Sequence, residues 1–313
     1  ANNEEKELAE YRAGEGKGMM LWGNHNHAYA QNAMGYSTES NVSGIYFGNR
    51  NWTVPHLVGY MESHDEERLM YKNLQFGNTS GAYSVKNETT ALARMKAAFL
   101  YFLPVPGPKM IWQFGELGYD ESINRCEDGS INNNCRLSPK PVPWADQDDY
   151  RKTALFNFVS DLNRLKKAYP VFQSGSATFT GPSTLAKQLT IKSNPYTTTP
   201  ASADQMNVQI VSNFGLQEEA FQISFPHTGV WYDYYSKQEL EVSTLPFTKS
   251  IPAGGYALYT DYPIENELVT SVSGEVSNQV VLYPNPTSEV LKVNISNGLV
   301  INVHATTSGP GTQ

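Results

Sequence analysis

The pattern of apolar residues changes once along this chain, near Pro170, and the change limits the folds that the chain can adopt. Before that point, short apolar runs alternate with helical patterns, as expected for β–α units around a parallel sheet. After it come short alternating runs rich in Thr, Val, Phe and Tyr, separated by Gly, Pro and Asn. This second pattern predicts an antiparallel sandwich. The expected fold class is therefore α/β plus all-β.

The apolar periodicity divides the chain further. In the α/β part we expect three strands and two long helices, at 18–24, 57–63, 109–114, 89–103 and 150–169. The expected domains are the α/β part at 1–170, the sandwich at 171–262, a linker at 263–278 and a small unit at 279–313.

Composition excludes several classes of protein. With 23 Lys and Arg against 31 Asp and Glu, the formal net charge is −8, which argues against a nucleic-acid partner because such a partner needs a basic face. The densest apolar run, 97–103, is too short to span a membrane and ends at Pro104. Aromatic residues make up 12% of the chain, a surplus that suits a protein presenting flat rings to a ligand.

Cys126 and Cys135 lie in one polar loop. A zinc site needs four ligands at short paired spacings, and the loop offers no further His or Cys. A loop-closing disulfide is favoured, which implies an oxidising compartment; two free thiols are the alternative. No metal centre is predicted.

Polar side chains gather where the predicted parallel strands end, and the segment 62–67 is the densest group. In parallel α/β barrels the reactive groups lie at the carboxyl ends of the strands. Asp65 there can accept hydrogen bonds from vicinal hydroxyls, and neutral His64 can donate one. The structural alternative is that Asp65 caps a following helix and that Glu66, Glu67 and Arg68 form its solvated first turn.

Two of these segments resemble a known family. Residues 57–68, Leu-Val-Gly-Tyr-Met-Glu-Ser-His-Asp-Glu-Glu-Arg, and residues 106–116, Pro-Gly-Pro-Lys-Met-Ile-Trp-Gln-Phe-Gly-Glu, resemble the last two barrel strands of the α-amylase family of glycoside hydrolases. The resemblance implies the C-terminal portion of a (β/α)8 TIM barrel, strands six to eight, followed by the β-sandwich. It also implies a retaining enzyme acting on α-glucans, in which Asp65 stabilises the transition state and His64 binds a sugar hydroxyl.

The same resemblance predicts that essential groups lie elsewhere. In the family the nucleophilic Asp follows the fourth strand and the general-acid Glu follows the fifth, so both are expected before Ala1. Glu4 and Glu5 are the alternatives for the acid, but no apolar strand precedes them and they read as helix surface. Since retaining hydrolysis needs two carboxyl groups, we expect residues 1–313 alone to be inactive. A transglycosylase or branching enzyme and a catalytically dead surface glycan-binding protein are the alternatives. A calcium ion is a candidate cofactor of the full-length protein.

Several further residues have both a functional and a structural interpretation. His25 and His27 follow the first predicted strand and could bind hydroxyls. Tyr119 and Arg136 line a sugar subsite or belong only to the loop surface. Four more candidates complete the set. Trp22, Trp112 and Trp144 could stack on sugar rings, but Trp22 and Trp112 sit within predicted strands, where the core is the favoured place. Glu116 could be a functional carboxylate, but the favoured interpretation is that it orders its loop through backbone hydrogen bonds.

The tail carries a second resemblance. Residues 282–294, Leu-Tyr-Pro-Asn-Pro-Thr-Ser-Glu-Val-Leu-Lys-Val-Asn, resemble the start of the C-terminal sorting domain of type IX secretion. This implies an interaction with secretion machinery and a secreted or cell-surface location. The pattern ends after Val303 in Gly, Ser, Thr and Pro, so the domain is expected to be truncated; an ordinary strand pair is the alternative.

Overall fold

The computed structural model describes residues 2–264, 291–294 and 300–303. The chain divides into two compact units, Ala1–Asn266 and Glu267–Gln313. Within the described residues, no helix combines the length and apolar character needed to cross a membrane.

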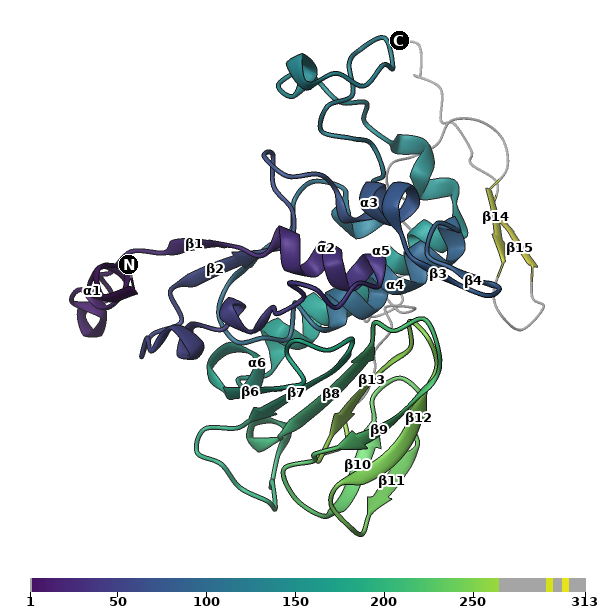
Figure 1. The fold of residues 1–313 in the computed structure, drawn as a ribbon. Helices are drawn as coiled ribbons and strands as arrows, with labels where there is room; N and C mark the ends of the chain where they lie inside the picture. The colour runs from purple at the N-terminus through teal and green to yellow at the C-terminus, as the bar shows by residue number, and fades with distance from the viewer. Residues whose placement is uncertain (1, 265–290, 295–299, 304–313) are drawn as a thin grey trace, which may run out of the picture. The chain divides into compact units, whose positions relative to one another are not determined.

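A three-stranded parallel sheet forms where the sequence predicts parallel strands (Figure 1). Its strands lie in the order β1 (Leu21–Asn24), β2 (Leu57–Tyr60) and β5 (Lys109–Met110). Each is shorter than its apolar run. Asn24 pairs with Tyr60, and Tyr60 with Met110, so all three strands end in register and the segments that follow them emerge at one edge of the sheet.

Helices alternate with these strands along the chain, as the sequence predicts. The two long predicted helices correspond to α4 and α5; Asn87 caps the first by accepting the Thr90 amide, and Asp149 caps the second by accepting the Arg151 amide. The helices are α1 (Asn2–Glu10), α2 (Asn26–Met34), α3 (Leu69–Phe76), α4 (Glu88–Leu100), α5 (Tyr150–Ala168) and α6 (Val171–Ser174), and a small hairpin joins β3 (Thr79–Ser80) to β4 (Tyr83–Ser84).

The later part of the unit is antiparallel, as predicted. A six-stranded sheet has the order β11-β10-β13-β8-β7-β6, and β12 pairs with β9 in a second sheet (Figure 1). The strands are β6 (Ser176–Thr180), β7 (Ala186–Lys192), β8 (Val208–Asn213), β9 (Glu219–Ile223), β10 (Gly229–Asp233), β11 (Glu239–Val242), β12 (Phe247–Ile251) and β13 (Tyr256–Thr260).

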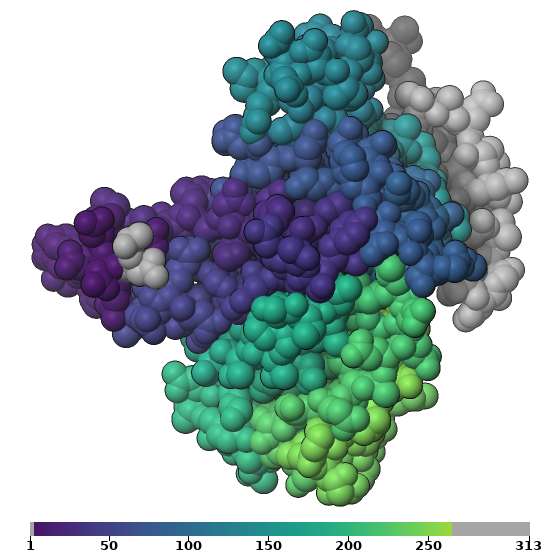
Figure 2. Space-filling model, in the orientation of Figure 1, coloured from purple at the N-terminus to yellow at the C-terminus, as the bar shows by residue number. Residues whose placement is uncertain are grey.

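Two hydrophobic cores lie on opposite faces of the six-stranded sheet. Ile210 of β8 belongs to the core shared with the helices, whereas its neighbour Val211 belongs to the core shared with the two-stranded sheet. This is the alternation expected of a strand buried on both faces. The helices and the antiparallel sheet are therefore joined by one continuous core. In Figure 2 the purple and blue surface of the α/β part adjoins the green surface of the antiparallel part.

Arg94 of α4 adds hydrogen bonds between the helices and the antiparallel part. Its guanidinium is fully buried and donates to the carbonyls of Ala33 and Phe214 at 2.6 Å and of Asn32 at 2.9 Å. The buried cation is thus solvated by main-chain carbonyls from α2 and from the segment after β8. The side chain fixes three elements that are far apart in the sequence.

Trp22 corrects one prediction. It was expected in the core, but its side chain is 63% exposed. Successive side chains of a strand point to opposite faces; Leu21 packs against the helix-side core, and Trp22 lies on the other face, where its ring contacts that of Tyr60 edge-on at 6.1 Å. Among the described residues, that face carries no covering layer over Trp22.

The second unit contains one described strand pair. β14 (Leu291–Asn294) and β15 (Val300–Val303) are antiparallel. β14 falls within the segment 282–294 that resembles a sorting domain. The rest of that segment and most of the linker 263–278 lie outside the described residues.

Candidate active site

His64 and Asp65 lie side by side in the segment between β2 and α3. Their side chains are 66% and 58% exposed, and His64 Nε2 is 3.2 Å from Asp65 Oδ2. The segment leaves the edge of the sheet where β1, β2 and β5 end. The structure therefore places both predicted residues at a strand exit, open to solvent.

Glu62, rather than Asp65, supports the start of α3. The helix begins at Leu69, and Glu62 Oε1 accepts the Leu69 amide at 2.6 Å. Burial raises the pKa of this carboxyl group. The alternative in which Asp65 caps the helix and residues 66–68 form its first turn is thus wrong. Asp65 therefore does not cap α3.

Arg68 is a residue whose role the sequence did not indicate. It was interpreted as part of a solvated turn, yet its side chain is only 3% exposed. Its Nη1 donates to the carbonyl of Gln113 at 3.0 Å and lies 4.0 Å from Glu62 Oε2, and burial lowers its pKa. Its guanidinium lies 5.9 Å from the ring centre of Trp112 and 5.1 Å from that of Tyr119. Arg68 thereby joins the exit of β2 to the exit of β5.

A cavity of about 260 Å³ opens beside His64. The rings of His64 and Trp112 are 5.9 Å apart at their centres, and Trp112 is half-buried, so it is not the core residue that the sequence predicts. An aromatic face beside an imidazole and a carboxylate can stack on a sugar ring and bond its hydroxyls. The cavity is lined by His64, Arg68, Trp112, Gln113, Glu121, Ser122, Ile123, Arg136, Leu137, Ser138, Pro139 and Lys140.

The loop after β5 supplies the other predicted residues. Arg136 Nη2 lies 3.4 Å from Asp65 Oδ1 and also donates to the Asp65 carbonyl. Cys126 and Cys135 are joined in a disulfide. Tyr119 is 2% exposed, its hydroxyl donates to the Pro141 carbonyl at 2.6 Å, and burial raises its pKa to about 12. This placement makes Tyr119 a support for Arg68 and argues against the predicted contact with a sugar.

His25 lies at the exit of β1, in a different setting from His64. Burial is the main reason that its pKa is lowered to about 4, and the nearby Arg50 cation lowers it further. Its Nε2 is buried without a hydrogen-bond partner. Neighbouring His27 is exposed and pairs with Glu39 at 2.8 Å. A depression of about 530 Å³ at this exit is lined by both histidines together with Asn24, Asn26, Ala28, Asn41, Glu66 and Lys72.

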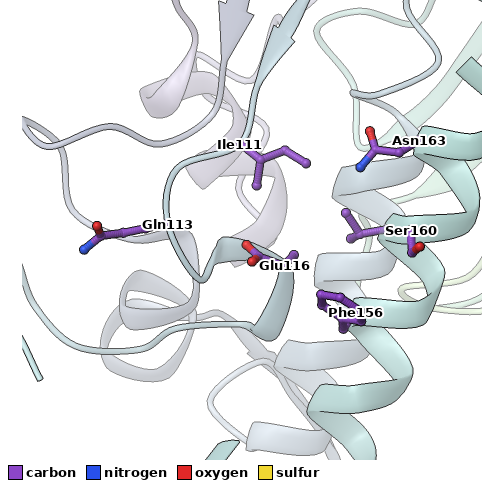
Figure 3. A pocket seen from close by; sticks show the side chains of 7 residues that line it. Ile111, Gln113, Glu116, Phe156, Ser160 and Asn163 are labelled. Atoms are coloured by element: carbon purple, nitrogen blue, oxygen red, sulfur yellow. The ribbon is translucent and has the colours of Figure 1, made fainter. Parts of the chain in front are cut away.

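Glu116 corrects a further prediction. The sequence predicts that it orders its loop through hydrogen bonds, but within the described residues its carboxylate makes none that fixes the loop. Figure 3 shows it facing a cavity of about 310 Å³ between the segment after β5 and helix α5. That cavity is lined by Ile111, Gln113, Glu116, Phe156, Val159, Ser160 and Asn163.

Metal ligands do not converge in this part of the chain. Among the described residues, no three His, Cys, Asp or Glu side chains form a group that could hold a metal ion.

Comparison with solved structures identifies the fold. The chain is similar to an α-amylase from Geobacillus thermoleovorans complexed with acarbose, with a TM-score of 0.52 and 12% identity over 75% of this chain and 46% of that one. It is also similar to AmyP in complex with maltose, with a TM-score of 0.53 and 13% identity over 75% and 48%. The described chain has the fold of part of an α-amylase.

The likeness extends to a pullulanase. A pullulanase from Anoxybacillus sp. LM18-11 matches with a TM-score of 0.52 and 15% identity over 75% of this chain and 34% of that one. The chain thus spans less than half the length of these three proteins. No family model matches the sequence, and no curated protein does so either.

Proposed function

We propose that the chain is the later part of a glycoside hydrolase of the α-amylase family that acts on α-glucans with retention of configuration. On this proposal β1, β2 and β5 are strands six to eight of a (β/α)8 barrel, and the antiparallel sheets are the sandwich that follows it. The parallel register of the three strands and the similarity in fold to two α-amylases and a pullulanase support it.

One observation carries the proposal. His64 and Asp65 are exposed, adjacent and beside Trp112 at the edge where the parallel strands end. Barrel enzymes bind their substrates at this edge.

The geometry gives each residue a task in glycosyl transfer. As the bond to the leaving sugar breaks, positive charge develops on the ring, and the Asp65 carboxylate stabilises it. His64, held 3.2 Å from Asp65, donates a hydrogen bond to a hydroxyl of the same sugar. Trp112 offers a face for stacking.

We also propose that residues 1–313 bind an α-glucan without cleaving it. Retaining hydrolysis needs two carboxyl groups on opposite sides of the bond, and the other carboxylates of the β2–α3 segment are engaged. Glu66 accepts bonds from Asn24 and Ser63, Glu67 accepts bonds from the loop after β5, and Glu62 holds α3. Turnover of soluble starch by residues 1–313 would contradict this statement.

Calorimetric titration with maltoheptaose tests the site. We expect His64→Ala to weaken binding by about tenfold, the loss of one to two hydrogen bonds. The control for Asp65→Asn is Asp204→Asn, which makes the same chemical change at an exposed position in Ala203–Gln205. This control should leave the affinity for maltoheptaose unchanged. Equal affinities for the wild type and His64→Ala would refute the proposal.

A glycan-binding protein without catalysis is the second candidate, because the neighbouring carboxylates of the segment are engaged. The two candidates differ in the longer protein that contains these residues. In an enzyme, Asp65→Asn should lower kcat by at least about a hundredfold with a modest change in KM. In a binding protein the same change should alter affinity alone.

We further propose that the protein is exported to the cell surface or the medium. The disulfide between Cys126 and Cys135 supports this, because disulfides persist mainly in oxidising compartments. The resemblance of residues 282–294 to a type IX sorting domain points the same way. Thiol titration of the protein recovered from its natural source tests it: two free thiols would contradict export.

A further inference from the structure

Asp65 is held by a residue 71 positions further along the chain. Arg136 Nη2 donates to the Asp65 main-chain carbonyl and lies 3.4 Å from Oδ1 of the same residue. Both side chains are about half exposed, 44% and 58%. One guanidinium therefore contacts both the backbone and the carboxylate of Asp65.

The loop that carries Arg136 is built to hold its shape. The disulfide joins Cys126 to Cys135, the residue before Arg136. Inside the loop, the Cys126 amide donates to the Ser130 carbonyl at 2.7 Å, and Lys140 Nζ donates to the Cys135 carbonyl at 2.8 Å. These contacts fix the backbone on both sides of Arg136.

The base of the same loop is tied to the segment that contains Asp65. Ser122 Oγ donates to Glu67 Oε1 at 2.6 Å, and the Ile123 amide donates to Glu67 Oε2 at 3.1 Å. The loop thus contacts the β2–α3 segment at two points, Glu67 near its base and Asp65 near its tip.

We propose that Arg136 is a positioning residue for Asp65, and that the Cys126–Cys135 disulfide fixes the loop that delivers it. An isolated surface ion pair contributes little because two long side chains must be ordered to form it. Here the disulfide and the Glu67 contacts order the loop beforehand, so less entropy is lost when Arg136 holds Asp65. The proposal rests on the proposed function for its purpose, the presentation of Asp65 to a sugar.

Backbone amide relaxation by NMR on residues 1–313 tests the positioning without any ligand. In the wild type, the order parameters of Asp65 and Glu66 should be near 0.85, typical of rigid backbone. In Arg136→Ala and in the double variant Cys126→Ser/Cys135→Ser they should fall to about 0.6 or below, and Arg136→Lys should restore part of the order. Arg12→Ala removes an arginine of similar exposure, 47%, and should change nothing at Asp65.

Maltoheptaose titration of the same variants separates this proposal from the proposed function. Arg136→Ala and the double cysteine variant should bind several-fold more weakly than the wild type. Unchanged order parameters at Asp65 in both variants would overturn the positioning role. If order falls as expected but the wild type does not bind maltoheptaose, the positioning role is supported and the proposed function fails.

Discussion

Glu62 shows how one side chain can decide where a helix begins. A sequence pattern identifies Asp65 as the better cap because Asp is favoured at that position. The structure uses Glu62, which also lies against the segment after β5: a Cβ atom at Gly115 would be 2.6 Å from Glu62 Oε2. A close approach between two strand exits is a tertiary contact, which local pattern does not encode. The sequence therefore predicted that His64 and Asp65 follow a strand, but not which contacts support the segment that carries them.

The lowered pKa of His25 predicts that the stability of the folded chain depends on pH. Its pKa is about 4 in the folded chain and about 6.5 in an unfolded one. Between these values the unfolded state binds a proton that the folded state excludes, so stability is present above about pH 6.5 and is lost as the pH falls toward 4. We expect a loss on the order of 2–3 kcal/mol in the free energy of unfolding.

Urea unfolding at pH 7.5 and pH 4.5 measures this loss of stability in the wild type and in His25→Gln, whose side chain cannot titrate. Other titrating groups are common to both proteins and cancel in the comparison. The wild type should lose more stability than the variant over this interval; a difference between the two proteins that is the same at both pH values would contradict the role of His25.

At the scale of elements, periodicity predicted the positions and the order of the strands well. The parallel strands, α4 and α5 all lie where the apolar pattern indicates, and the antiparallel strands β6 to β13 lie within the predicted range 171–262. The lengths were overestimated, because apolar residues continue past the last sheet hydrogen bond. Trp22 and Trp112 were misplaced for a related reason: a strand pattern does not say which face another layer covers.

The contacts of Arg94 between helices and sheet predict a large effect of its replacement on stability. The substitution Arg94→Met leaves the carbonyls of Ala33 and Phe214 without their buried donor. We expect a loss of about 3 kcal/mol or more in the free energy of unfolding. Lys86→Met, at an exposed position, is the matched control and should change it by less than about 0.5 kcal/mol. Equal urea midpoints for the two variants would show that Arg94 does not join these elements.

At the scale of the whole molecule, the helices and the antiparallel sheet depend on each other. The core that covers α4 and α5 includes Leu189, Ile191 and Ile210 from the six-stranded sheet, all fully buried. The sequence indicated two consecutive folds but not this shared core, since it is formed by residues distant in the chain. Truncation after residue 170 should therefore expose apolar surface and give an aggregating product. Soluble residues 1–170 with cooperative thermal unfolding would contradict this.

The proposed function requires that a sugar binds beside Trp112, His64 and Asp65. The chain has five tryptophans, whose indole N–H signals can be followed by NMR while maltoheptaose is added. We expect the Trp112 signal to shift with saturable dependence on sugar concentration, whereas those of Trp231 and Trp52, which are buried elsewhere, stay in place. No shift at Trp112, or a shift confined to the other tryptophans, would contradict it.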